Sequence, residues 1–216
     1  MALAVRCGET ARPPEAGAGV ETALPPPRPT GPIAVEQALA RRRSIRQFAA
    51  RDLTLEHVGQ LLWAAQGVTE PSRGLRTAPS AGALYPLEVY AVKRDGVFRY
   101  VAQGHKLVRL SKRDARAALA NAALGQSAVR DAPLDIVIAA IYERTRAKYG
   151  ARAERYVHIE VGHVGQNIHL QAVALGLGSV SIGAFDDGAV ARVLGLPAAE
   201  QPLYIIPVGS RRSGSQ

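Results

Sequence analysis

The 216-residue chain has few of the features that mark secreted or membrane proteins. Its one cysteine, Cys7, cannot form an internal disulfide, and it lies in a segment without secondary-structure pattern, so we do not take it as a catalytic thiol. No apolar run approaches the roughly 18 residues of a membrane-spanning helix. The N-terminus lacks the basic-then-apolar pattern of a secretion signal. We therefore expect a cytoplasmic protein with no membrane contact.

Aromatic residues are also scarce, whereas basic residues are abundant. Phe, Trp and Tyr make up 5% of the chain, and 27 Lys and Arg against 18 Asp and Glu give a formal net charge of +9. A basic protein suits an anionic ligand or cofactor, and it would also suit nucleic acid. Because the aromatic residues are not interleaved with the main basic run, as stacking on single strands requires, we do not expect a nucleic-acid partner.

Composition predicts a tail followed by one domain. Residues 1–32 are rich in Ala, Gly and Pro and show neither helical nor strand periodicity, so we predict a disordered N-terminal tail. The remainder is long enough for one substantial core. We therefore predict a single domain over residues 33–210 and a short C-terminal tail over residues 211–216.

From residue 33 helical and strand patterns alternate. The patterns predict helices over 33–41, 55–66, 115–124, 156–175 and 189–194, and strands over 87–94, 97–103, 134–142, 179–185 and 202–209. Asp95-Gly96 predicts a hairpin turn. Thr54 and Gly67 are the expected N-cap and stop of the second helix, and Ser111 with Asp114 forms a variant capping box. These elements predict an α+β fold with a mixed central sheet flanked by helices.

The run RRRSIRQF, Arg41 to Phe48, carries the densest chemical signal of the chain. Guanidinium groups bind phosphate oxygens as two-point forks and keep their charge, while a serine hydroxyl or a free N–H fills the remaining acceptor sites. The run therefore predicts a phosphate site. A solvated basic helix end or a nucleic-acid patch would have the same kind of sequence. The run alone does not decide between these alternatives and a phosphate site.

Four blocks in order resemble the nitroreductase superfamily of flavin enzymes. They are RRSIRQF (42–48), RTAPSAGALYPLEVY (76–90), GHVGQNIHLQAVALGLGS (162–179), and SIGAFDD (181–187) leading to IPVG (206–209). The form APSAGALYP resembles the SagB- or ThcOx-type branch, the peptide-azoline dehydrogenases. The resemblance runs from about Val35 to Gly209. It implies a nitroreductase-like fold, an intertwined homodimer and FMN as the cofactor.

The resemblance also implies roles for individual residues. The FMN phosphate would be held by three residues with a fourth close by: Arg42, Ser44 and Arg46, with Arg43. Arg211 and Arg212 would add basic charge there, unless they belong to a frayed terminus. A loop of small residues would cover the flavin ring of the other subunit: Pro79, Ser80, Ala81 and Gly82. Backbone N–H groups of one segment would face flavin N5 and O4: Ile182, Gly183 and Ala184.

Glycines and histidines on the predicted long helix raise two structural questions. Gly162 and Gly165 would each cost about 1 kcal/mol relative to Ala in an isolated helix, so close packing must compensate, either against a two-fold mate or against the chain's own sheet. His158 and His163 would point about 140° apart, and His158 and His169 would lie about 16 Å apart along the axis. With no His-Glu-x-x-His motif, we expect no metal.

The choice between possible reactions rests on Lys148 and Tyr149. In azoline dehydrogenases, which this region resembles, a Lys-Tyr pair is implicated in removing the substrate proton while hydride leaves for flavin N5. A lysine can act as a base if burial or neighbouring cations lower its pKa, and Arg144, Arg146 and Arg152 would supply such a field. The alternative is a solvated lysine on an exposed loop.

Three functions remain open. The first is an FMN-dependent dehydrogenase that oxidises azolines to azoles in a modified peptide, with a cyclodehydratase as a candidate partner. The second is a general NAD(P)H-dependent nitro or quinone reductase acting on small molecules. Since no glycine-rich dinucleotide fingerprint is present, NAD(P)H would bind transiently. The third is a basic nucleic-acid-binding protein that retains a flavin fold.

Overall fold

A seven-stranded sheet lies between two layers of helices. The computed structural model describes residues 19–212. The strands lie in the order β1-β6-β5-β4-β7-β9-β8. Their bounds are Glu21–Ala23 (β1), Leu87–Lys93 (β4), Gly96–Val101 (β5), Lys106–Ser111 (β6), Leu134–Ala140 (β7), Leu177–Ser179 (β8) and Gln201–Ser210 (β9). A separate pair, Val68–Glu70 (β2) and Leu75–Arg76 (β3), forms a small ribbon.

All pairings between neighbouring strands of the large sheet are antiparallel. The α+β fold predicted from the sequence is confirmed, but the mixed sheet is not. Parallel pairing among the described residues is confined to the isolated bridge between Ser44 and Ser179. The alternation of helices with strands suggested parallel crossovers, whereas each sheet neighbour here runs in the opposite direction.

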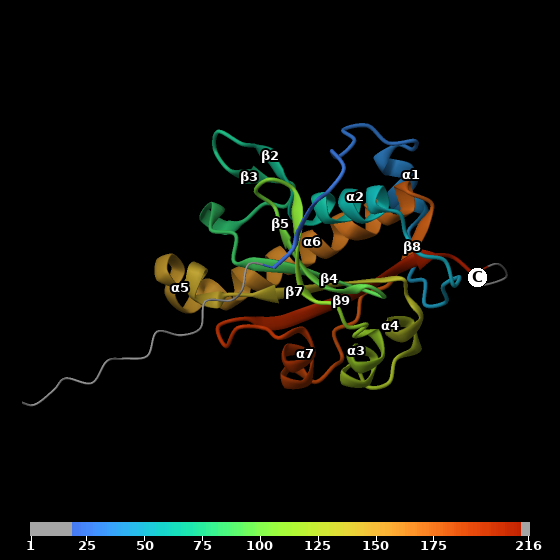
Figure 1. Cartoon of the computed structure of the whole chain (residues 1–216). Helices are drawn as coiled ribbons and strands as arrows, with labels where there is room; N and C mark the ends of the chain where they lie inside the picture. Colours follow the sequence, from blue (N-terminus) through green and yellow to red (C-terminus); the bar gives the residue numbers. More distant parts are fainter. Residues whose placement is uncertain (1–18, 213–216) are drawn as a thin grey trace, which may run out of the picture.

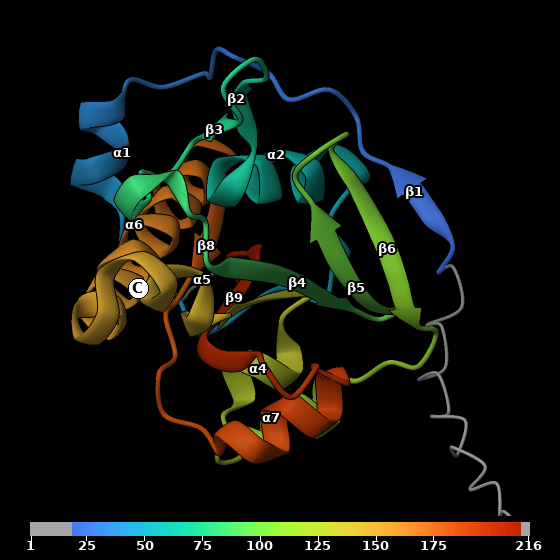
Figure 2. The ribbon, with the colours of Figure 1, turned by 90° about the vertical axis from the view of Figure 1, so that its left-hand side faces the viewer.

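The helices cover both faces of the sheet. Their bounds are Val35–Arg41 (α1), Leu55–Gln66 (α2), Arg116–Ala122 (α3), Ser127–Asp131 (α4), Tyr142–Tyr149 (α5), Ala153–Ala174 (α6) and Asp187–Leu194 (α7). Helices α1, α2 and α6 lie on one side, and α3, α4 and α7 on the other (Figures 1 and 2). Within residues 19–212, none of the helices has the length and apolar character needed to cross a membrane.

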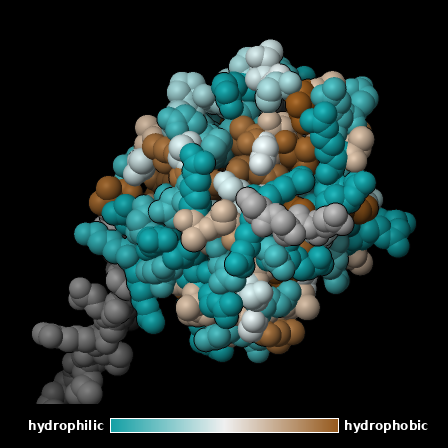
Figure 3. Space-filling view, turned by 90° about the vertical axis from the view of Figure 1, so that its right-hand side faces the viewer, coloured by the Kyte–Doolittle hydropathy of each residue, from teal (hydrophilic) through white to brown (hydrophobic). Residues whose placement is uncertain are grey.

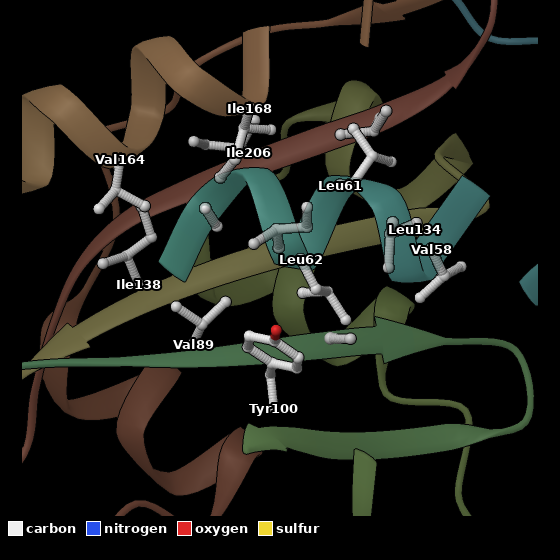
Figure 4. Close-up of a cluster of buried hydrophobic side chains, with 14 of the residues drawn as sticks. Val58, Leu61, Leu62, Val89, Tyr100, Leu134, Ile138, Val164, Ile168 and Ile206 are labelled. Atoms are coloured by element: carbon white, nitrogen blue, oxygen red, sulfur yellow. The ribbon is translucent and has the colours of Figure 1, made fainter. Parts of the chain in front are cut away.

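Strand β7 separates the two hydrophobic cores. All seven of its residues are buried, which confirms the prediction of a central strand with both faces covered. Ile136 and Ile138 belong to the core under α2 and α6, whereas Val137 and Ala139 belong to the core under the other helices. Figure 4 shows the first core, where Leu61 and Leu62 of α2 and Val164 and Ile168 of α6 approach Ile138 and Ile206.

Local signals placed several elements correctly. Helix α2 has the predicted bounds, and the Thr54 hydroxyl accepts a hydrogen bond from the His57 N–H at 3.3 Å. The predicted hairpin is present, but its two turn residues are Arg94 and Asp95, because Gly96 opens β5 and pairs with Lys93. The variant capping box is wrong: α3 begins at Arg116, Ser111 ends β6, and the Ser111 hydroxyl accepts from the Arg113 N–H instead. The strand predicted over 179–185 extends only to Ser179.

The predicted N-terminal tail is wrong for the part of it that the structure describes. Residues 21–23 form β1, which pairs with β6, and Lys106 binds Glu21 at 2.8 Å. Leu24 is buried in the core. An edge strand needs only backbone partners on one side, so a composition rich in Ala and Pro did not reveal it. Residues 1–18, with Cys7, and residues 213–216 lie outside the described residues.

The two glycines of α6 have different surroundings. A Cβ on Gly165 would lie 3.3 Å from the Tyr204 ring of β9, so this glycine permits close packing of α6 on the chain's own sheet. A Cβ on Gly162 would meet nothing within 4 Å, and Gly162 is exposed. The chain's own packing therefore explains Gly165 and leaves Gly162 unexplained.

Candidate functional site

The arginine-rich segment lies beside the end of β8. The Ile45 N–H donates to the Ser179 carbonyl at 2.9 Å, and Ile45 and Phe48 are buried. This anchoring leaves Ser44 and Arg46 exposed. The contact is tight, because a Cβ on Gly178 would lie 2.7 Å from Ile45.

Three arginines here have side chains without a partner in the part of the chain that the structure describes. Among residues 19–212, the side chains of Arg42, Arg46 and Arg211 make no hydrogen bond or ion pair. The backbone bridge between Phe48 and Arg211 brings Arg211 to the same segment. Figure 3 looks onto the side of the molecule where α1 and the C-terminal end lie, and hydrophilic side chains surround smaller hydrophobic patches there. The guanidinium groups of Arg42, Arg46 and Arg211 are donors of the kind that bind the oxygens of a phosphate monoester.

Arg43 differs from the other predicted phosphate ligands. Its guanidinium donates to the carbonyls of Ala40 at 3.1 Å and Arg42 at 2.7 Å. These are orphan carbonyls at the C-terminal end of α1, where a cation also suits the helix dipole. The structure therefore gives Arg43 a helix-capping contact.

A buried histidine lies behind the same segment. The His169 ring of α6 lies between two serine hydroxyls, with Nδ1 at 2.7 Å from Ser179 Oγ and Nε2 at 2.6 Å from Ser181 Oγ. Burial, aided by the positive charge of Arg42, lowers the pKa of His169 to about 4. The imidazole is therefore neutral near pH 7. The sequence predicted a core or interface histidine here but not this contact.

Of the three predicted backbone donors from Ile182 to Ala184, those of Gly183 and Ala184 are free among the described residues, whereas the Ile182 N–H is already used and the prediction for it is wrong. Ile182 is fixed by reciprocal backbone hydrogen bonds with Ile205, at 2.8 and 3.0 Å. Gly183 and Ala184 are exposed, and within the described chain their N–H groups have no hydrogen-bond partner. A Cβ on Gly183 would meet only Tyr204, at 3.9 Å. The surface above this backbone is therefore open to a planar ligand. The described residues thus offer donors suited to the ring of FMN as well as donors suited to its phosphate.

The loop of small residues and the Lys-Tyr pair form a second cluster. A Cβ on Gly82 would lie 2.8 Å from the Tyr149 hydroxyl and 3.0 Å from Lys148 Nζ, so both side chains point at this glycine. Gly82 has a φ of 64°, a conformation that glycine tolerates best. The Tyr149 ring packs edge to face on Tyr156 with centroids 5.0 Å apart. The structure therefore brings together two motifs that are more than sixty residues apart.

The arginine field expected around Lys148 is largely compensated. Arg144 donates to Glu88 at 2.6 Å and to the Tyr85 carbonyl at 3.0 Å. Arg146 pairs with Glu143. Lys148 itself is exposed at the end of α5. Two of the three cations invoked from the sequence thus have a carboxylate partner, and the segment is a helix rather than a loop.

Glu160 of α6 lies beside the loop of small residues, and the sequence did not predict it as a site residue. It is 2% exposed, and Gln66 Nε2 donates to its carboxylate at 3.3 Å. Arg76 in turn donates to Gln66 at 3.2 Å. Burial raises the pKa of Glu160, while hydrogen bonds from Ser80 and Gln66 oppose that rise. A hollow of about 270 Å³ opens beside it, lined by Pro79, Ser80, Ala81, Tyr156, Ile159, Glu160 and His163.

The two clusters lie at different levels of α6. Glu160 contacts Ser80 of the loop cluster, which comprises residues 79–82 with Lys148 and Tyr149. His169 contacts Ser179, which pairs with Ser44 of the phosphate-side cluster, comprising Arg42, Ser44, Arg46 and Arg211. Nine residues of α-helix separate Glu160 from His169 by about 13 Å and roughly half a turn. One chain therefore presents the two halves of the predicted site on different parts of its long helix. A larger cavity of about 530 Å³, between residues 28–35, α2 and α6, contains none of the predicted site residues.

The remaining histidines do not form a metal site in the described part of the chain. No group of three His, Cys, Asp or Glu side chains is placed to hold a metal within residues 19–212. His158 instead contacts the Tyr142 hydroxyl through Nε2 at 2.6 Å, and His163 is exposed.

Comparison with known proteins identifies the family of the chain. Residues 39–210 match the nitroreductase family. The chain is 46% identical over 185 residues to a "putative nitroreductase" of Methanocaldococcus jannaschii, covering 83% of this chain and 92% of the relative. The chain therefore belongs to the nitroreductase family and is an FMN-dependent oxidoreductase, in place of the non-enzymatic alternative.

Solved structures agree on the fold. A "putative nitroreductase" of Ralstonia eutropha superposes with a TM-score of 0.81 at 28% identity, over 96% of this chain and 97% of that one. Two more distant structures share the fold alone. The Escherichia coli microcin synthetase McbBCD complex gives 0.72 at 23% identity, over 86% and 77% of the chains. The NADPH:FMN oxidoreductase of Vibrio harveyi gives 0.63 at 22% identity, over 83% and 69%.

Proposed function

We propose that the chain forms a homodimer with two composite FMN sites, each built from the phosphate-side cluster of one subunit and the loop cluster of the other. The observation that carries this proposal is a group of cations without partners among residues 19–212 beside the exposed Ser44, which pairs with Ser179, together with the free N–H groups of Gly183 and Ala184 shortly after Ser179 in the chain. Arg42, Ser44, Arg46 and Arg211 would hold the phosphate. When bound, FMN supplies hydride transfer at N5.

The second subunit would supply the loop. The loop of Pro79 to Gly82 contacts Glu160, about 13 Å along α6 and half a turn around it from His169, and this separation favours a loop supplied by a partner copy. Exposed apolar residues on the same helix layer support a dimer contact: Ile159 on α6 is 49% exposed, and Val35 and Leu39 on α1 are 56% and 53% exposed. The open space at Gly162 supports it as well.

For the reaction, we propose oxidation of an azoline ring in a modified peptide. The support is the convergence of Lys148 and Tyr149 on Gly82, because this places an amine and a phenol beside the loop that would cover the ring. Lys148 would take the carbon-bound proton, and Tyr149 would orient it. The likeness to a microcin synthetase complex, whose solved structure holds a truncated precursor peptide, is consistent with a cyclodehydratase partner.

A general NAD(P)H-dependent nitro or quinone reductase is the second candidate. The fold is shared with the NADPH:FMN oxidoreductase of V. harveyi, and Arg144 and Arg146 have carboxylate partners, so the field around a lysine base is weaker than the sequence suggested. This reaction needs no base at Lys148, since the hydride already resides on the reduced cofactor and the acceptor can take its proton from water.

A mixed dimer tests the composite site directly. Subunits carrying Arg46→Ala and subunits carrying Lys148→Ala are co-expressed with different tags, and the mixed dimer is purified. If each site draws on both subunits, the mixed dimer contains one site free of both lesions and regains about half of the parent azoline oxidation. If both clusters of one chain serve the same site, each site has one lesion and activity stays as low as in the single variants.

A further inference from the structure

A chain of three side chains leads from the interior to the proposed ring site. Ser179 is 2% exposed, His169 is 7% exposed, and Ser181 is half-buried. The imidazole joins the two hydroxyls, through Nδ1 to Ser179 at 2.7 Å and through Nε2 to Ser181 at 2.6 Å. Both bonds are short enough to be well formed.

The direction of these hydrogen bonds follows from the burial of Ser179. A neutral imidazole has one N–H donor and one acceptor nitrogen. Within the described residues, His169 Nδ1 is the one hydrogen-bond partner of the Ser179 hydroxyl. If Ser179 accepted from Nδ1, its own hydrogen would be buried without a partner, which is unfavourable. Ser179 therefore donates to Nδ1.

The opposite nitrogen must then carry the ring proton. His169 Nε2–H donates to Ser181 Oγ, which leaves the hydrogen of the Ser181 hydroxyl unused. In the described part of the chain Ser181 Oγ has no other partner. Ser181 immediately precedes Ile182, Gly183 and Ala184, whose backbone borders the open surface. Its hydroxyl is therefore a donor available to a ligand at that surface.

We propose that Ser181 donates a side-chain hydrogen bond to the bound flavin, in addition to the backbone donors of Gly183 and Ala184, and that His169 is the positioning residue that fixes its direction. The ligand atom is an acceptor, such as a ring carbonyl or nitrogen or a ribityl oxygen. The same imidazole links this donor to the phosphate-side segment, because Ser179 also pairs with Ser44. The proposal rests on the proposed FMN site.

The first test has a readout, the tautomer of His169, that does not depend on bound cofactor. Nitrogen-15 NMR of the histidine rings, with His169 assigned through His169→Gln, is recorded on the protein with and without FMN near pH 7. We expect His169 as the neutral tautomer protonated at Nε2. Ser179→Ala removes the donor to Nδ1, so this variant should show the other tautomer or a mixture. A parent ring protonated at Nδ1, or doubly protonated, would overturn the proposal.

The second test measures FMN affinity by titration of the flavin-free protein. Ser181→Ala should raise the dissociation constant roughly 2- to 12-fold, as expected for one lost neutral hydrogen bond, and Ser181→Thr should restore it. Ser72→Ala, at an exposed turn, is the matched control and should change nothing. Equal affinity of the parent and Ser181→Ala would refute the contact. A parent that binds no FMN would refute the proposed site itself, so the two failures are distinguishable.

Discussion

Gly82 and Tyr149 face each other so closely that a Cβ on Gly82 would lie 2.8 Å from the Tyr149 hydroxyl. The contact joins the loop of small residues to the Lys-Tyr pair, which are far apart in the sequence. It also explains why the loop has glycine at this position, since the φ of 64° and the close phenol both disfavour a side chain.

Gly82→Ala should therefore disturb the cluster more than its backbone conformation alone requires. Gly74 is a matched control, because it has a φ of 65° and nothing within 4 Å of its Cβ position. Both substitutions should cost about 1–2 kcal/mol for the left-handed backbone, and Gly82→Ala should cost up to about 1 kcal/mol more, the low end for overpacking, because the contact is with the far ends of the Lys148 and Tyr149 side chains. Thermal unfolding of both variants measures the difference. Equal destabilisation would mean that Lys148 and Tyr149 move aside freely.

Lys148→Ala separates the two proposed reactions. Azoline oxidation needs a base, so its rate should fall by about 10²- to 10⁴-fold, with a smaller loss for Tyr149→Phe. Quinone reduction by NAD(P)H and the FMN content should remain close to those of the parent. The measurement is the ratio of the two activities in each variant. A parallel fall of both activities would give Lys148 a structural or cofactor-binding role, and a parent that never oxidises an azoline would favour the general reductase.

Arg46→Ala should weaken FMN binding by about 1.5–3 kcal/mol, the range for a lost charge-assisted hydrogen bond. Arg43→Ala is the informative comparison. Because the Arg43 guanidinium donates to carbonyls at the end of α1, its loss should lower the unfolding temperature and change FMN affinity less. Titration with FMN and thermal unfolding together distinguish these roles. Identical affinities for parent and Arg46→Ala would remove Arg46 from the site.

Asp135 predicts a pH dependence of stability that is unrelated to the site. It is fully buried on β7, neither carboxyl oxygen has a hydrogen-bond partner among the described residues, and burial raises its pKa well above the usual value. The raised pKa means that the folded state holds the proton more tightly than the unfolded state, so stability falls as pH rises above the ordinary carboxyl range.

Asp135→Asn removes this titration. The parent and the variant should have similar unfolding free energies near pH 4, and the variant should gain relative to the parent as the pH is raised to 8. Denaturant unfolding across this range checks the sign. A gap that is constant with pH would show that Asp135 does not titrate with folding.

The sequence predicted the elements whose signals are local. The β4–β5 hairpin, the Thr54 cap and the continuous apolar run of β7 each depend on neighbouring residues, and all three are confirmed, although the hairpin turns one residue earlier than predicted. Strand β1 could not be found in this way, since an edge strand is defined by the β6 backbone beside it rather than by its own side chains.

The same distinction holds for the candidate site. Motifs pointed to Arg46, Gly82 and Lys148, because their residue types and order resemble a known family. The contacts of Glu160 with Gln66, and of His169 with Ser181, join different elements of the fold. In the sequence nothing marks these residues as members of a site. Their partners become visible only when α6 packs against α2 and against the segment that follows β8.

The most direct test of the account is the cofactor of the purified protein. The proposed site has one set of phosphate ligands, Arg42, Ser44, Arg46 and Arg211, so the protein should be yellow, or become so on reconstitution, and denaturation should release FMN. Chromatography of the released flavin against FMN and FAD standards, with protein quantified in the same sample, gives its identity and stoichiometry. We expect about one FMN per subunit. Release of FAD, or a colourless protein that FMN cannot reconstitute, would contradict the account.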